Sequence, residues 1–131
     1  MAFTRVANEQ VSVGTSITIE ALSPAGELCA VFEDDGKTGY FYAASDIGGE
    51  RKILDAVMIY AVSSIANRHL PSQVEVIWSE VRNCVAILVD RRPHAVFDFE
   101  EKIGYCREEF PPSHGEWTRS PWDEKVRRWF L

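Results

Sequence analysis

The sequence predicts a mainly β fold, at the border with the α+β class: an antiparallel meander of about six or seven strands with a short C-terminal helix. Short runs of β-branched and aromatic residues recur along the chain with a two-residue alternation of apolar and polar side chains. Clusters of Gly, Pro, Ser and Asp separate these runs. The 131 residues show no internal repeat, low-complexity tract or linker, so we expect residues 1–131 to form a single domain.

The clearest element is a hairpin over Leu28–Ala43. Its arms flank the acidic turn Asp34-Asp35-Gly36-Lys37, in which Asp-Gly supplies the positive φ angles of a tight turn. Both faces of the first arm are apolar, which is typical of a strand in the middle of a sheet. In the second arm Tyr40 and Tyr42 share one face.

Other strands are predicted from the same alternation: Ser16–Ala21, Val74–Ser79, Cys84–Asp90 and His94–Glu100. The run Ile53–Val62 also fits a helical stripe, but its Val, Ile and Tyr content favours a strand. Residues 1–11 carry little pattern and are predicted as a lead-in arm.

Near the C-terminus, Ser120 suits a helix cap and Pro121 suits the first helical position. The residues that follow form an apolar stripe with helical spacing: Trp122, Val126, Trp129 and Phe130. We therefore expect a short amphipathic helix whose aromatic side chains cover one face of the sheet.

The charge balance and the cysteines narrow the class of protein. With 20 acidic and 14 basic residues the net charge is −6, which argues against a nucleic-acid partner. Cys29, Cys84 and Cys106 are odd in number and widely spaced, which fits reduced thiols better than a disulfide framework or a zinc site.

The sequence shows neither a signal peptide nor a membrane-length apolar run. We expect a cytoplasmic protein with no membrane partner and no cofactor.

Two groups of residues are candidates for chemistry. Asp34, Asp35 and Asp46 offer carboxylates for a divalent cation, but Asp-Asp-Gly lacks the ligand spacing of a calcium loop, so turn geometry is the favoured role and no metal is predicted. His94 and Asp98 share a strand face, yet their Cα atoms lie about 13 Å apart. An acid–base pair would need a partner from a neighbouring strand, with Asp46, Cys106 or Tyr42 as the candidates.

Several phrases together resemble a known family. They are Glu-Asp-Asp-Gly-Lys-Thr-Gly-Tyr-Phe-Tyr-Ala from Glu33, Ile-Leu-Asp-Ala from Ile53, Ile-Trp-Ser from Ile77 and Pro-His-Ala-Val-Phe-Asp-Phe from Pro93. On these motifs residues 28–107 are similar to a domain-of-unknown-function family of small bacterial proteins. The resemblance implies a bacterial origin and a compact domain, and it carries over no catalytic residues.

The sequence leaves two classes of function open. The leading hypothesis is a non-enzymatic protein-binding module, with toxin neutralisation as a narrower version, that presents an acidic surface to a basic partner. Its binding residues are Asp34, Asp35, Tyr40, Tyr42, His94 and Asp98. The alternative is a small hydrolase or ligand-binding enzyme with a pocket near His94, Asp98 and Cys106. A third possibility is that exposed strand edges and the aromatic tail serve only to form a homodimer.

Overall fold

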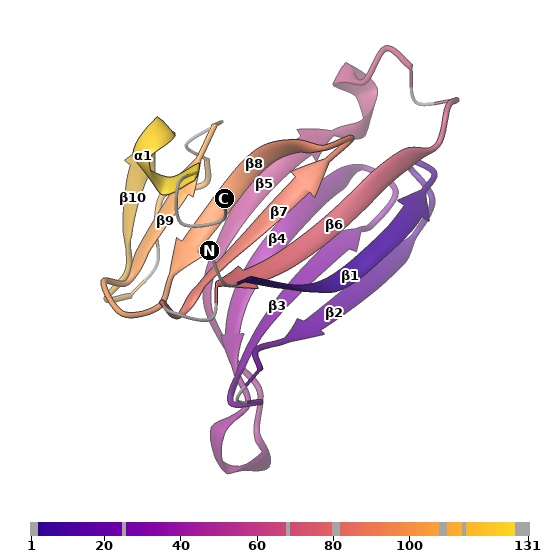
Figure 1. The fold of residues 1–131 in the computed structure, drawn as a ribbon. Coiled ribbons are helices and arrows are strands. Elements are labelled where there is room, and N and C mark those ends of the chain that lie inside the picture. The colour runs from indigo at the N-terminus through magenta and orange to yellow at the C-terminus, as the bar shows by residue number, and fades with distance from the viewer. Residues whose placement is uncertain are drawn as a thin grey trace.

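The computed structural model describes residues 3–24, 26–67, 69–79, 82–107, 110–113 and 115–127. These residues form two β-sheets packed face to face, with one short helix (Figure 1). The mainly β prediction is confirmed, although the described chain holds ten strands rather than six or seven.

The first sheet has six strands in the order β1-β6-β7-β8-β9-β10. Their bounds are β1 Phe3–Val11, β6 Ser72–Ser79, β7 Cys84–Val89, β8 Arg92–Asp98, β9 Ile103–Cys106 and β10 Thr118–Pro121. All neighbours in this sheet pair antiparallel except β9 and β10, which run parallel. The parallel pair departs from the purely antiparallel meander that the sequence predicts.

The second sheet is a four-stranded meander in the order β2-β3-β4-β5. Its strands are β2 Ile17–Leu22, β3 Leu28–Asp34, β4 Thr38–Ser45 and β5 Lys52–Ala61. The predicted hairpin is confirmed as β3 and β4, and the ambiguous run is confirmed as strand β5. Two short 3₁₀ turns follow strands of this sheet: η1 Ile47–Gly49 and η2 Val62–Ser64.

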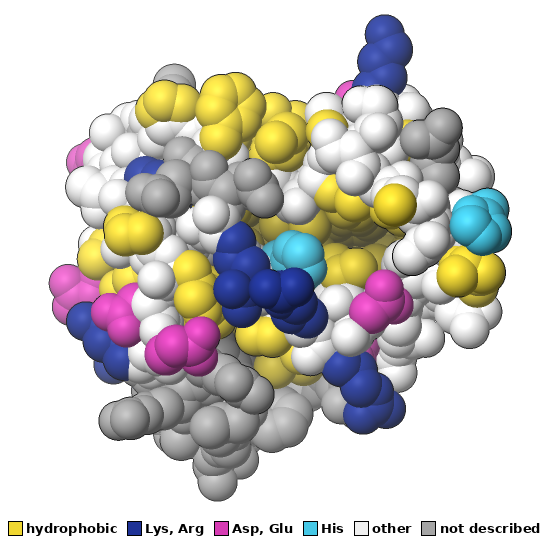
Figure 2. Space-filling view, turned by 90° about the horizontal axis from the view of Figure 1, so that it is seen from above, with side chains coloured by type: hydrophobic (Ala, Val, Ile, Leu, Met, Phe, Trp, Pro, Cys, Tyr) yellow, Lys and Arg dark blue, Asp and Glu magenta, His cyan; other side chains and the backbone are white. Residues whose placement is uncertain are grey.

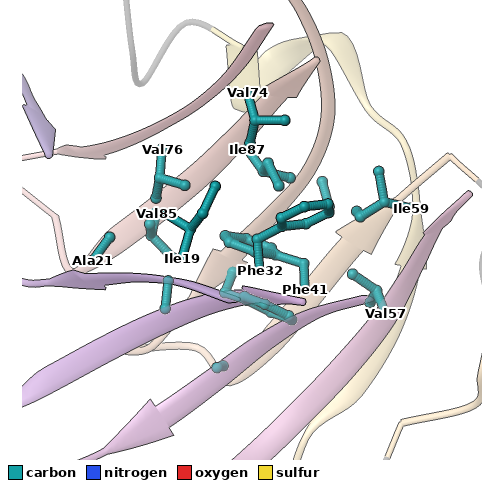
Figure 3. Packing of buried hydrophobic residues seen from close by; sticks show 14 of the residues in the cluster. Ile19, Ala21, Phe32, Phe41, Val57, Ile59, Val74, Val76, Val85 and Ile87 are labelled. Carbon is teal, nitrogen blue, oxygen red and sulfur yellow. The ribbon is translucent and has the colours of Figure 1, made fainter. Parts of the chain in front are cut away.

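The main core lies between the two sheets, where inward-facing side chains of both meet (Figure 3). The four-stranded sheet contributes Ile19, Ala21, Phe32, Phe41, Val57 and Ile59, and the six-stranded sheet contributes Val74, Val76, Val85 and Ile87. Phe41 also stacks on Phe97 of β8, with ring centroids 5.1 Å apart. Each of these strands therefore follows the two-residue alternation seen in the sequence.

The helix α1, Glu124–Arg127, packs on part of the outer face of the six-stranded sheet. Val126 is buried there against Ile77, Val96 and Tyr105, and Trp122 packs against the same cluster. The expectation that the tail packs on a sheet face is confirmed for these residues. The predicted start of the helix is wrong, because Ser120 and Pro121 end strand β10 and the helix begins at Glu124. Trp129 and Phe130 of the predicted stripe lie outside the described residues.

Candidate functional site

The two aspartates of the acidic turn have different surroundings. Asp34 is completely buried, and its carboxylate accepts hydrogen bonds from the backbone N–H groups of Gly14 and Gly36, both at 2.8 Å. The Tyr60 hydroxyl donates a third bond to it at 2.7 Å. Asp34 therefore ties the hairpin turn to the β1–β2 connection and to β5, and it presents no exposed atom to a partner.

Asp35, by contrast, is exposed. One of its carboxylate oxygens accepts hydrogen bonds from the backbone N–H groups of Thr38 and Lys37, each at 2.9 Å. These two hydrogen bonds lower the pKa of Asp35 below its usual value, and the bond from Thr38 has the larger effect. The turn thus keeps one negative charge directed to solvent at the end of the β3–β4 hairpin.

Tyr40 and Tyr42 lie side by side on the outer face of β4, as their two-residue spacing predicts. Their rings stack with centroids 6.0 Å apart and an interplanar angle of 29°. The Tyr42 hydroxyl donates to Glu33 on β3 at 3.2 Å. Partial burial, followed by the Glu33 charge, raises the pKa of Tyr42 to about 12, so this phenol remains a donor at neutral pH.

These tyrosines belong to a larger surface that we call the tyrosine face, which is the outer face of the four-stranded sheet. Strand pairing sets it out in three cross-strand rows: Thr18, Glu33, Tyr40 and Met58; Glu20, Val31, Tyr42 and Ala56; Leu22, Cys29, Ala44 and Ile53. Leu22 and Ile53 are exposed at 49% and 47%. Within the described part of the chain, no helix or strand lies over this face (Figure 1).

Asp46 lies at the opposite end of β4 from Asp35, so the three aspartates considered for a cation do not converge. Both carboxylate oxygens of Asp46 accept hydrogen bonds from Arg51, and the distance from Arg51 Nε to Asp46 Oδ1 is 2.8 Å. Arg51 also forms an ion pair with Glu20 on the tyrosine face. Among the described residues there is no group of three or more His, Cys, Asp or Glu that suits a metal ion.

The structure does not bring His94 and Asp98 together. A β-bulge between β7 and β8 leaves His94 without a register partner, and His94 lines a pocket between the two sheets. Asp98 is 1% exposed and accepts hydrogen bonds from Arg82 at 2.9 Å and from the backbone N–H of Glu100 at 3.0 Å. Asp98 therefore stabilises the β8–β9 turn, while His94 faces a different environment.

Cys106 is nearer to His94 in register, because it pairs with Ala95. Its side chain belongs to the main core, is 1% exposed, and lies 3.6 Å from the Met58 carbonyl oxygen. It is not among the residues that line the pocket beside His94. The sequence-level group of His94, Asp98 and Cys106 is thus divided among a pocket, a turn and the core.

Sequence reasoning missed one buried charged pair. Arg119 on β10 forms a two-pronged ion pair with Asp55 on β5, at 2.7 and 2.8 Å, and both side chains are at least nine-tenths buried. The guanidinium passes directly over Gly104 of β9, where any Cβ would collide with it. The available signal was a lone aspartate inside the apolar run of β5, which needs a buried partner.

The fold and the site together define a two-sheet β-sandwich whose one outer face is partly covered by a helix and whose other outer face is open. The chain belongs to a family of uncharacterised proteins conserved in bacteria, DUF2251, which it matches over residues 11–131. The family match extends beyond the range indicated by the sequence motifs, so it includes the β10 strand and the C-terminal helix.

A relative from Haemophilus influenzae, an uncharacterized protein, is 36% identical over 114 residues. The alignment covers 85% of this chain and 71% of the relative. No solved structure matches the chain. None of the helices in the described residues has the length and apolar character needed to cross a membrane.

Proposed function

We propose that the chain is a non-enzymatic protein-binding module and that its tyrosine face binds a basic partner protein. The observation that carries this proposal is the stacked pair Tyr40 and Tyr42 on an open sheet face, beside the acidic side chains of Glu33 and Asp35. Tyrosine is enriched among the residues that dominate binding energy, because it combines a large apolar area with a polar tip.

The rest of the tyrosine face has the composition of an interface core. Val31 and Met58 are the cross-strand neighbours of Tyr42 and Tyr40. The exposed Leu22 and Ile53 extend the apolar surface along another row. A sheet face that carries exposed aliphatic and aromatic side chains without a covering layer is typical of an interaction site. On the outer face of the six-stranded sheet, by contrast, α1 buries Val126 against Ile77, Val96 and Tyr105.

The acidic charge of the tyrosine face favours a basic partner protein over a second copy of this chain. Acidic side chains on or beside the tyrosine face outnumber basic ones: Glu20, Glu33, Asp35 and Asp46 against Lys37 and Arg51. The chain as a whole has a net charge of −6, so two copies repel each other. A positively charged protein, such as a cytoplasmic toxin or nuclease that must be neutralised, complements this surface and associates rapidly.

The test is salt-dependent capture of proteins from the native bacterial lysate by the immobilised chain. We expect one stoichiometric partner that binds at low salt and weakens at high salt. Asp35→Lys should reduce its capture strongly, and Asp35→Asn, which keeps an acceptor oxygen for the turn, should reduce it less.

The matched control is Glu9→Lys, the same reversal at an exposed position of β1 in the other sheet. This variant should capture the partner as well as the unmodified chain does. Equal capture by Asp35→Lys and the unmodified chain would remove the acidic end of the tyrosine face from the interface.

A further inference from the structure

A pocket of about 560 Å³ opens between the two sheets at the end of the sandwich that holds η2 and the β7–β8 turn. Figure 2 looks onto this end and shows a hollow with an apolar floor, with a histidine, basic side chains and an acidic side chain at its rim. The lining includes Val13, Ile59, Val89, Asp90, Arg92 and His94. The pocket lies between the sheets, whereas the tyrosine face is the outer surface of the four-stranded sheet; Met58 is the one residue of the three rows that also lines the pocket.

The floor of the pocket is continuous with the main core. Val13 and Ile59 are buried members of the core cluster, while Ile65 and Val89 are partly buried against it. An aliphatic chain entering between the sheets would therefore contact apolar side chains on both sides. Each methylene group removed from water there strengthens binding about fourfold.

The rim carries polar groups that the protein itself does not use. Among the described residues, neither the His94 imidazole nor the Arg92 guanidinium has a hydrogen-bond partner, and Arg92 is exposed. The neighbouring charged groups are engaged elsewhere. Asp90 accepts a hydrogen bond from the Gln73 backbone N–H at 2.8 Å, and the Arg107 guanidinium lies 4.7 Å from the Trp122 ring. The pocket thus offers the Arg92 guanidinium and the His94 ring as hydrogen-bond donors, beside the exposed Asp90 carboxylate, which already accepts one hydrogen bond.

The backbone at this rim is strained. Asp90 and Arg91 form the two-residue turn between β7 and β8, and both have positive φ angles, 52° and 67°. Such turns favour Asn-Gly, and a non-glycine residue in the left-handed region is less stable there than glycine. The strained turn and the adjacent bulge together position Arg92 and His94 over the apolar floor, and strain of this kind is common at ligand-binding sites.

We propose that this pocket binds a small aliphatic carboxylate, with its chain on Val13 and Ile59 and its carboxylate between Arg92 and His94. Arginine binds carboxylates through charge-assisted hydrogen bonds, and a neutral histidine provides one further N–H donor. Arg92 carries the positive charge that attracts the carboxylate, while the exposed Asp90 at the same rim already accepts the Gln73 backbone N–H.

The probe is sodium octanoate, titrated into protein labelled with ¹³C at its histidines and followed by NMR. The His94 resonance, assigned with His94→Gln, should move with a saturable dependence on octanoate, and the His69 and His114 resonances should not. Arg92→Gln should weaken the binding about tenfold or more, which corresponds to the loss of one charge-assisted contact.

Arg91→Gln is the matched control, since it removes the same charge one position away at an exposed site that does not line the pocket. It should change the affinity by less than about twofold. The proposal is overturned if octanoate produces no saturable shift of His94, if octylammonium binds as well as octanoate, or if the two arginine variants behave alike. The backbone amide spectrum of each variant shows that it is folded.

Discussion

His94 sits at the extra position of a bulge, and its side chain lines a pocket that also contains Tyr60, Asp90 and Arg92. Burial, followed by the charges of Arg107 and Arg92, lowers the pKa of His94 from 6.5 to about 4. The imidazole is therefore neutral in the folded protein at pH 5, where most of the unfolded chains carry it protonated.

The consequence is a pH-dependent stability. Above pH 6.5 His94 is neutral in both the folded and the unfolded chain, so it does not change the free energy of unfolding. As the pH falls from 6.5 to 4, His94 binds a proton in the unfolded chain but not in the folded one, and this favours unfolding. We expect the free energy of unfolding to fall over this range by about 1–2 kcal/mol more in the unmodified chain than in His94→Gln, after allowance for partial exposure. Urea denaturation at a series of pH values measures this difference, and identical pH dependence in the two chains would contradict it.

The three cysteines are predicted to be unreactive in the folded protein. Cys29 and Cys84 are fully buried and Cys106 is 1% exposed. Burial, followed by the charge of Asp98, raises the pKa of the Cys84 thiol to about 12. Iodoacetamide should add no mass at neutral pH to the native chain and three adducts to the chain in urea. Rapid modification of native Cys106 would instead indicate an accessible nucleophile.

Residue-level roles were the hardest to predict from the sequence. Asp34 and Asp35 are the same residue type in the same turn, and they differ in their tertiary contacts. Only Asp34 accepts hydrogen bonds from Gly14 and Tyr60, which lie in other parts of the chain. The sequence predicts that His94 and Asp98 share a strand face, because strict alternation puts residues four apart on the same side. The bulge breaks the alternation, and no local residue pattern marks its position.

At the scale of elements, the buried pair of Asp55 and Arg119 holds β10 against β5 across the end of the sandwich. Arg119 also donates to the carbonyl oxygens of Ala56 and Pro111, at 3.1 Å each. Arg119→Met removes the only charge that compensates Asp55 among its described hydrogen-bond partners, so we expect a loss of about 3–5 kcal/mol in unfolding free energy.

Two further variants separate a buried charge from lost packing. Adding Asp55→Leu to Arg119→Met should restore much of the stability, because no charge is then left buried. Arg51→Met, which breaks a pair whose arginine is 38% exposed, should cost less than about 1 kcal/mol. Equal losses from Arg119→Met and Arg51→Met, measured by chemical denaturation, would contradict this assignment.

The strands that the sequence predicted, β2 to β8, are those with long runs of β-branched and aromatic residues. One hydrophobic side of each of them lies in the main core. The missed strands depend on their partners instead. β1 carries a mixture of polar and apolar residues and pairs with β6, while β9 and β10 have four residues each and pair in parallel. A short strand has too few residues for a periodicity to show.

At the scale of the whole molecule, the two sheets differ in what covers them. The six-stranded sheet is partly covered by α1, which buries Val126 on its outer face. The four-stranded sheet has the tyrosine face, which no described helix or strand covers. This asymmetry follows from the position of the helix after β10, at the far edge of the six-stranded sheet, and it leaves the surface rich in tyrosine and acidic residues available to a partner.

The most direct test of the proposed function is site-specific photocrosslinking in the native bacterium. Benzoylphenylalanine placed at Thr18, an exposed position on the tyrosine face, should form an adduct with one basic protein, and the adduct should disappear when Tyr42→Ser is added. The same photoreactive residue at Glu9 in the other sheet should not form it. No adduct from position 18, a crosslinked dimer of the chain itself, or the same adduct from position 9 would contradict binding of a basic partner on the tyrosine face.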